Sequence, residues 1–227
     1  MGEMVQFQSN GREASGYLAT PANGSGPGLI VIQEWWGLVP HIKEVADRFA
    51  AEGFVALAPD LYDGETVAEP DEAGKLMMAL ELDKAGKHMG GAIDYLVAND
   101  AVTSTGVGVM GFCMGGGLAI WLATTRREVA AAVPFYGAIP WEGVEPDLTA
   151  TRAAFLGHYA ENDDWATMES AREIEATLRS LGHRAEFHLY KDTGHAFFNN
   201  TRPEVYDAEA SNLAMNRTVE FLHETLT

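Results

Sequence analysis

The sequence predicts an α/β protein in which helices cover both faces of a mostly parallel central sheet. Short apolar runs alternate with stretches whose apolar residues recur at helical spacing through most of the 227 residues. The run at 29–32 is wholly apolar, as expected for a strand that is buried on both faces. Regular alternation of strands and helices requires right-handed crossovers and therefore predicts a parallel sheet between two helical layers.

The first half of the chain contains the signals for four strands, one helix and one broken helical region. Asn10-Gly11 separates two short strands and is typical of a tight hairpin turn. Glycines at 86 and at 90–91 interrupt a long helical pattern, so we expect that helix to break near one of them. The expected elements are strands at 4–8, 14–19, 29–32 and 54–58, a helix at 41–51, and a broken helical region at 71–97.

The second half repeats the alternation. It is expected to contain strands at 107–111, 129–135, 153–158 and 185–190, and helices from about Leu118, at 168–181 and at 208–226. Hydrophobic residues make up 47% of the chain, enough for one substantial core, and no repeat or linker divides it. We therefore expect a single domain spanning 1–227.

Charge and composition limit the classes of molecule that the protein is expected to bind and the compartment in which it is expected. The net charge of −18, from 15 Lys and Arg against 33 Asp and Glu, argues against binding nucleic acid or an anionic membrane. The first residues lack the basic and apolar segments of a secretory signal, and no apolar run is long enough to span a membrane. One cysteine cannot form an internal disulfide, which fits a reducing compartment, so a cytoplasmic protein is expected. Either a monomer or a small homo-oligomer is compatible with the sequence.

The strongest chemical signal is the segment Gly111-Phe112-Cys113-Met114-Gly115. A strand that ends in a Gly-x-nucleophile-x-Gly turn before a helix is a nucleophile elbow, and its glycines allow a strained turn and a close approach of strand and helix. A cysteine flanked by Phe and Met is more often an inert core residue. The surrounding glycines favour the nucleophile, because a deprotonated thiol attacks carbonyl carbons readily.

An acid and a base follow at later strand ends. Asp163 and Asp164 come after the strand at 153–158, and His195 comes after the strand at 185–190. Nucleophile, acid and base in this chain order are those of the α/β-hydrolase triad, so we expect the α/β-hydrolase fold. Either aspartate could be the acid on position alone. The remaining histidines, His158 among them, show no paired spacing, and no metal site is predicted.

A carboxylate, Glu34, ends the strand at 29–32. In this fold that loop lies beside the elbow, so the backbone N–H of Trp35 and that of Met114 are expected to form the oxyanion hole. A carboxylate close to the thiol would disfavour the thiolate until it is moved, although Glu34 could also be a simple cap or surface residue. Further substrate contacts are expected at Trp36, Tyr136, Phe198, Asn199 and Arg202.

Together these segments resemble the dienelactone hydrolase family. The matching motifs are Gln33-Glu34, Ala58-Pro59-Asp60-Leu61-Tyr62, Gly111-Phe112-Cys113-Met114-Gly115-Gly116, the acid segment 160–167, and Gly194-His195-Ala196-Phe197. The resemblance implies a hydrolase without a cofactor that opens a dienelactone to maleylacetate. It also implies that Asp163 is the acid, that Glu34 first deprotonates Cys113, and that His195 activates the water that cleaves the acyl-enzyme.

The chain departs from the family at the arginines that hold the substrate carboxylate. Asn199 stands four residues after His195, where one arginine is expected, with Arg202 three residues further on. No arginine lies between Tyr62 and Val97, where the other is expected. A general carboxylesterase of small esters is therefore the alternative within enzymes. A non-catalytic binding protein and a redox sensor that uses the lone cysteine are the alternatives outside this activity.

Overall fold

The computed structural model describes residues 2–227 and has a central sheet of eight strands in the order β1-β2-β4-β3-β5-β6-β7-β8. β2 runs antiparallel to both of its neighbours, and the remaining pairs are parallel. The strands are β1 (Glu3–Ser9), β2 (Arg12–Ala19), β3 (Gly26–Ile32), β4 (Val55–Pro59), β5 (Val102–Phe112), β6 (Val129–Phe135), β7 (Ala154–Asn162) and β8 (Ala185–Gly194).

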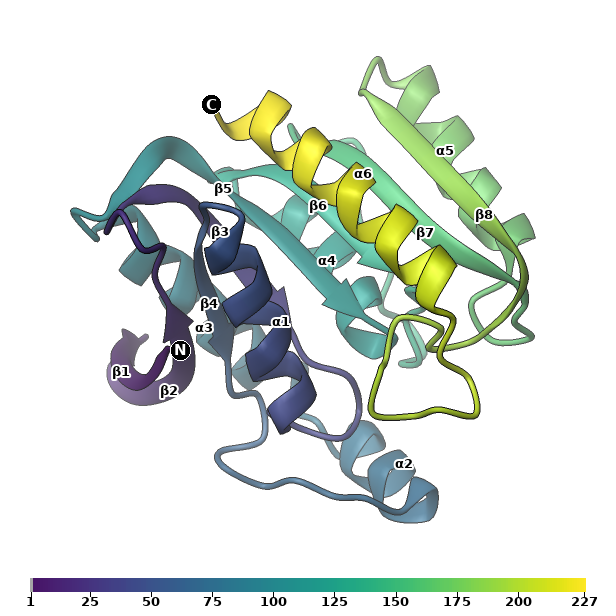
Figure 1. The fold of residues 1–227 in the computed structure, drawn as a ribbon, viewed down its shortest axis with the longest axis horizontal. Helices are drawn as coiled ribbons and strands as arrows, with labels where there is room; N and C mark the ends of the chain where they lie inside the picture. Colours follow the sequence, from purple (N-terminus) through teal and green to yellow (C-terminus); the bar gives the residue numbers. More distant parts are fainter. Residues whose placement is uncertain (1) are drawn as a thin grey trace.

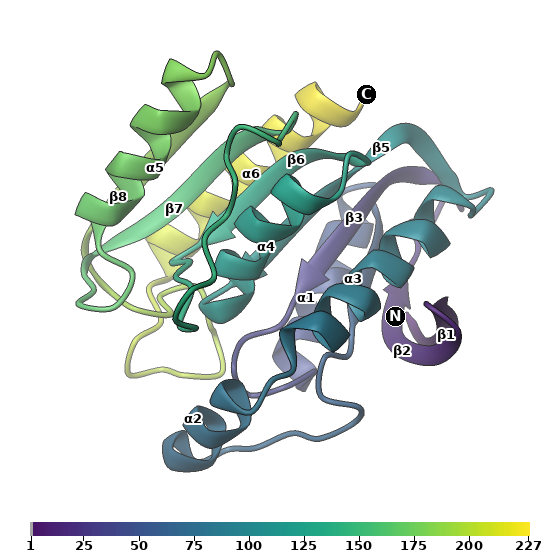
Figure 2. The same cartoon turned by 180° about the vertical axis from the view of Figure 1, so that it is seen from behind.

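Residues 2–227 also contain six helices. They are α1 (Pro40–Ala51), α2 (Pro70–Met78), α3 (Leu82–Val97), α4 (Met114–Thr125), α5 (Met168–Ser180) and α6 (Ala208–Leu226). α1 and α6 cover one face of the sheet (Figure 1), and α3, α4 and α5 cover the other (Figure 2). The predicted fold class, a mostly parallel sheet with helices on both faces, is confirmed by this arrangement.

The hairpin at Asn10-Gly11 forms as predicted. Ser9 pairs with Arg12, and both turn residues have positive φ, 48° at Asn10 and 84° at Gly11. A two-residue turn of this kind matches the right-handed twist of the paired strands, and Asn followed by Gly tolerates it best. The core lies deeper in the sheet, where every residue of β3 is buried.

Two predicted helix boundaries are wrong. The helical region breaks at residues 79–81, whereas Gly86, Gly90 and Gly91 lie inside α3. These glycines allow close packing: a Cβ at Gly86 would lie 2.8 Å from the Trp121 ring, and one at Gly91 would lie 2.4 Å from the carbonyl oxygen of Gln8. A glycine weakens a helix by only about 1 kcal/mol, which close packing offsets.

The helix after the elbow begins at Met114, four residues earlier than predicted. The run Gly115-Gly116-Gly117 has poor helical propensity, but it is buried against neighbouring backbone. A Cβ at Gly115 would lie 2.3 Å from the Gln33 carbonyl oxygen, and one at Gly116 would lie 2.7 Å from the Gly137 Cα. Tertiary packing therefore decides where this helix starts, and α4 begins at the residue after the cysteine.

Candidate active site

Four of the predicted catalytic residues follow the carboxyl ends of parallel strands. Cys113, Asp163 and His195 are the first residues after β5, β7 and β8, and Glu34 is the second residue after β3. Because β3, β5, β6, β7 and β8 are parallel, these ends meet at one edge of the sheet. The fold therefore brings together residues that are far apart in the sequence.

Cys113 occupies a strained turn. Its φ is 58° and its ψ is −121°, a conformation that side chains with a Cβ rarely adopt. The cysteine N–H donates to the Phe135 carbonyl at 3.1 Å, which ties the turn to β6. A Cβ at Gly111 would lie 2.1 Å from the Gly115 carbonyl oxygen, so the strand and the helix can meet here only at a glycine. The geometry is that of a nucleophile elbow.

The cysteine side chain reaches a small cavity of about 290 Å³. Its lining consists of Trp35, Met77, Cys113, Trp165 and His195. Most of this lining is apolar, and it includes no lysine or arginine. Cys113 itself is only 5% exposed. A ligand carbonyl can thus reach the sulfur and the imidazole in the same cavity.

The two amides predicted for the oxyanion hole both face the sulfur. The N–H groups of Met114 and Trp35 hydrogen-bond to the Cys113 sulfur and lower its pKa, but larger effects oppose them. Burial, followed by the charge of Glu34, raises the pKa of Cys113 well above its ordinary value. The resting sulfur is therefore a protonated thiol, and it occupies the position where the amides would hold a substrate oxygen.

His195 is oriented by Asp163. The histidine Nδ1 lies 2.6 Å from Asp163 Oδ2, and Asp163 Oδ1 accepts backbone N–H groups from Trp165 and Ala166 at 2.9 Å each. Burial acts to raise the pKa of Asp163, but the hydrogen bond and charge of His195 outweigh it, with help from the two amides, and the pKa is lowered. Asp163 is 7% exposed, whereas Asp164 is exposed to solvent. Of the two adjacent aspartates, Asp163 is thus the one that contacts the histidine.

Glu34 is held by two uncharged donors. It is 1% exposed, its Oε1 accepts the Tyr136 hydroxyl at 3.3 Å, and its Oε2 accepts the Asn199 amide at 2.7 Å. Burial, followed by the charge of Glu34, raises the pKa of Tyr136 well above its ordinary value, so the tyrosine remains a donor. Neither donor carries a charge, so no cation pairs with Glu34 in these contacts, and the residue is neither a helix cap nor a surface residue.

Comparison with known proteins identifies the family. A profile of the dienelactone hydrolase family matches residues 14–226. The chain belongs to the dienelactone hydrolase family. Membership makes it a hydrolase of carboxylic ester bonds.

Relatives match along the whole chain. It is 39% identical over 234 residues to protein usf of Aquifex pyrophilus, with 100% of both chains covered. It is 35% identical to a protein of Aquifex aeolicus named "Putative carboxymethylenebutenolidase", covering 95% of this chain and 97% of the relative. The crystal structure of a dienelactone hydrolase-like promiscuous phosphotriesterase from metagenomic libraries shares its fold, with a TM-score of 0.88 at 22% identity over 100% and 99% of the two chains.

Five residues were expected to contact substrate in this member of the dienelactone hydrolase family, and none of them lines the Cys113 cavity. Tyr136 and Asn199 bind Glu34 instead. Phe198 is fully buried and stacks on Phe112 at 5.3 Å between ring centroids, so it is a core residue. Trp36, Asn199 and Arg202 line a separate hollow of about 360 Å³, where the guanidinium lies 5.1 Å from the Trp36 ring.

The structure adds two lining residues that the sequence did not reveal. Trp165 stands two residues after Asp163, and its position next to the predicted acid was a usable signal. Met77 belongs to α2, and the residues around it have the pattern of an ordinary amphipathic helix, which gives no sign of an active site. His158 is buried, is not among the lining residues of the cavity, and hydrogen-bonds to Tyr190 and Thr218, which is a structural role.

Two further features of the described residues concern metal-binding clusters and helices that could span a membrane. Within residues 2–227, no three His, Cys, Asp or Glu side chains converge in a way that could hold a metal ion. The lining of the Cys113 cavity includes a thiol and an imidazole, and the amides of Trp35 and Met114 hydrogen-bond to that thiol. Among the helices described, none is both long and apolar enough to cross a lipid bilayer.

Proposed function

We propose that the protein hydrolyses a small ester or lactone through a thioester on Cys113. The observation that carries this proposal is that the strained cysteine and the histidine bound to Asp163 line one small cavity. Asp163 keeps the proton of His195 on Nδ1, which leaves Nε2 free to accept a proton. A binding protein would have no need for a base oriented in this way.

In the first half of the reaction the proton of the Cys113 thiol moves to Glu34, and the thiolate attacks the carbonyl carbon. Once the sulfur has left the amides of Met114 and Trp35, these donate to the developing oxyanion, each contributing about 3 kcal/mol in comparable hydrolases. The carbon–sulfur bond forms and the ester carbon–oxygen bond breaks. The proton that left the thiol ends on the leaving oxygen.

In the second half a water molecule takes the position that the leaving oxygen vacated. His195 Nε2 accepts one proton from this water, and the hydroxide adds to the thioester carbon. The carbon–sulfur bond breaks, the acid product leaves, and the proton on His195 returns to the sulfur. The products are one carboxylic acid and one alcohol, or a ring-opened hydroxy acid from a lactone, and the enzyme regains its starting state.

The cavity favours uncharged substrates over the carboxylate-bearing dienelactone. No lysine or arginine lines it, and Arg202 lies in a different hollow where it pairs with Glu204. Opening of a dienelactone to maleylacetate is the second candidate, because relatives carry the name carboxymethylenebutenolidase. An uncharged ester or lactone avoids burying a carboxylate beside Glu34, which would be costly without a cation.

Alkylation and mutation of Cys113 test this function. Because the chain has one cysteine, iodoacetamide modifies a single thiol, and stoichiometric alkylation should abolish turnover of p-nitrophenyl acetate and γ-butyrolactone. Cys113→Ala should do the same while thermal unfolding stays close to wild type. Retention of a tenth or more of the wild-type rate in either case would show that the nucleophile has been misassigned. A dienelactone measured in parallel should react more slowly than the uncharged lactone, and the reverse order would select the second candidate.

A further inference from the structure

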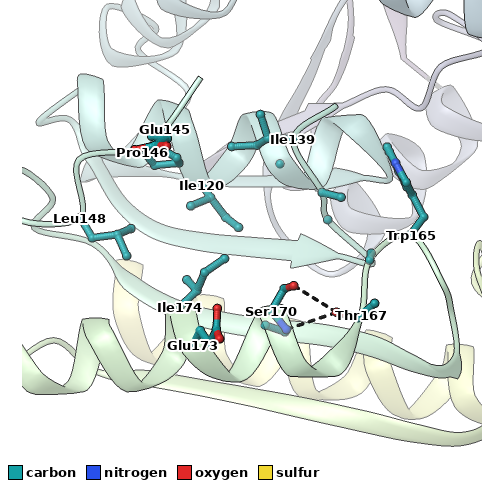
Figure 3. Close-up of a pocket in the computed structure, with 15 residues that line it drawn as sticks. Ile120, Ile139, Glu145, Pro146, Leu148, Trp165, Thr167, Ser170, Glu173 and Ile174 are labelled. Carbon is teal, nitrogen blue, oxygen red and sulfur yellow. Dashed lines mark hydrogen bonds between the residues drawn. The ribbon is translucent and has the colours of Figure 1, made fainter. Parts of the chain in front are cut away.

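A second and larger chamber lies next to the Cys113 cavity. It measures about 590 Å³ and lies between α4, the loop after β6, and α5 (Figure 3). Ile120 comes from α4, Ile139 and Leu148 come from the loop, and Ile174 comes from α5. Its volume falls in the usual range of small-molecule sites, whereas the cavity at Cys113, about 290 Å³, lies at the lower limit of that range.

Trp165 is shared by the two spaces. Its side chain lines both the chamber and the Cys113 cavity, and it is 40% exposed. The indole packs edge-on against the His195 ring, with 5.2 Å between centroids and 72° between planes. Its backbone N–H is bound to Asp163, so the main chain is fixed while the side chain separates the two spaces. A group that passes the indole therefore moves from the catalytic histidine into the chamber.

The charges at the chamber identify the kind of group that fits. Glu145 and Glu173 are its charged lining residues, and both are exposed to solvent. Figure 3 shows Trp165 at one end of the chamber and Glu145 with Leu148 toward the other. No lysine, arginine or histidine lines it. The chamber thus offers an apolar interior and an acidic far end, which suit an uncharged alkyl group and disfavour a terminal carboxylate.

We propose that this chamber binds an apolar alkyl substituent on the alcohol side of the ester or lactone. The inference rests on the proposed function. The water that cleaves the thioester must lie within reach of His195, and it takes the position of the leaving oxygen. That oxygen therefore also lies beside His195, and the indole of Trp165 packs against the same ring. The substituent on the leaving oxygen is directed past Trp165 into the chamber, while the acyl group stays in the smaller cavity.

Two isomeric esters test the direction of binding. Hexyl acetate carries its chain on the alcohol side, and ethyl hexanoate carries it on the acyl side. Each methylene that enters an apolar site can raise kcat/KM by up to about fourfold, the equivalent of about 0.8 kcal/mol. Hexyl acetate should therefore exceed ethyl hexanoate in kcat/KM by at least tenfold. Equal values, or a preference for ethyl hexanoate, would overturn the proposal.

Variants that fill the chamber give an independent readout. Ile174→Trp on α5 and Ile139→Trp on the loop should each reduce kcat/KM for hexyl acetate at least tenfold and leave methyl acetate within about twofold of wild type. Thr177→Trp is the matched control, because it lies on an exposed face of α5 outside the chamber lining and should change neither substrate. If both filled variants keep the wild-type ratio of hexyl to methyl acetate, the chamber does not bind the alkyl chain.

Failure of this inference can be told from failure of the proposed function. If methyl acetate turnover survives alkylation of Cys113, the proposed function is wrong. The inference that the chamber binds part of the substrate then fails with it. If alkylation abolishes methyl acetate turnover but hexyl acetate shows no preference, only the chamber assignment is wrong. A carboxylate at the far end of the chain should lower kcat/KM. The wild-type enzyme should accordingly have a higher kcat/KM for hexyl acetate than for 6-acetoxyhexanoate. Glu173→Gln should reduce the ratio of these two kcat/KM values.

Discussion

Substitution of Asp163 by asparagine probes the hydrogen bonds around His195. In the structure Asp163 Oδ1 accepts two backbone amides, and Oδ2 accepts the histidine Nδ1–H. An asparagine can keep both backbone bonds with its carbonyl oxygen, which places its NH₂ group against Nδ1. Because NH₂ is a donor, the histidine must then carry its proton on Nε2, where it can no longer accept one from water.

The expected loss in kcat is about 10³- to 10⁴-fold, which corresponds to about 4 to 5.5 kcal/mol at 1.36 kcal/mol per tenfold change in rate. The stability cost is smaller, because the two backbone bonds remain and only one charged hydrogen bond, worth about 1.5 to 3 kcal/mol, is lost. At this chain length that loss lowers Tm by about 3 to 12 °C. The fold should thus survive while turnover is nearly abolished.

Steady-state hydrolysis of p-nitrophenyl acetate and thermal unfolding measure these two effects. Asp164→Asn is the matched control, since Asp164 is exposed and should leave both values near wild type. Mass spectrometry of the Asp163→Asn variant during turnover should show an accumulated acyl-enzyme, because deacylation depends on His195. Near-normal turnover of Asp163→Asn, or an equal loss in Asp164→Asn, would refute the assignment of the acid.

Two further substitutions test the electrostatics and the packing of the elbow. Burial and then the charge of Glu34 raise the pKa of Cys113, so Glu34→Gln should lower that pKa and speed alkylation by iodoacetamide between pH 7 and 9 while slowing ester turnover. Slower alkylation together with slower turnover would contradict this sign. Gly111→Ala should prevent folding, since its Cβ would lie 2.1 Å from a backbone oxygen. At Gly74 in α2 a Cβ would meet only the Trp35 ring, at an ordinary contact distance of 4.0 Å, so Gly74→Ala should unfold at or slightly above the wild-type temperature. Soluble, fully active Gly111→Ala would show that the elbow can relax.

The proposed triad could be predicted from short segments because each of its members directly follows a strand. Cys113, Asp163 and His195 stand at the ends of β5, β7 and β8, and a parallel sheet brings such ends to one edge without further information. The choice between Asp163 and Asp164 was not readable from local sequence alone. It depends on which carboxylate turns toward His195, and the backbone amides of Trp165 and Ala166 fix that orientation.

Tertiary structure alone decided what surrounds the reacting groups. Asn199 and Tyr136 were expected to contact substrate, yet both hydrogen-bond to Glu34, because burial of a carboxylate demands nearby donors. Met77 lines the cavity from α2, a helix whose sequence pattern gives no sign of an active site. Trp165 lines both the Cys113 cavity and the second chamber. Sequence periodicity thus determined the sheet, the elbow and the order of the catalytic groups, since these depend on local residue pattern. The shape and charge of the space around Cys113 depend on side chains from distant segments, and only the folded chain brings those together.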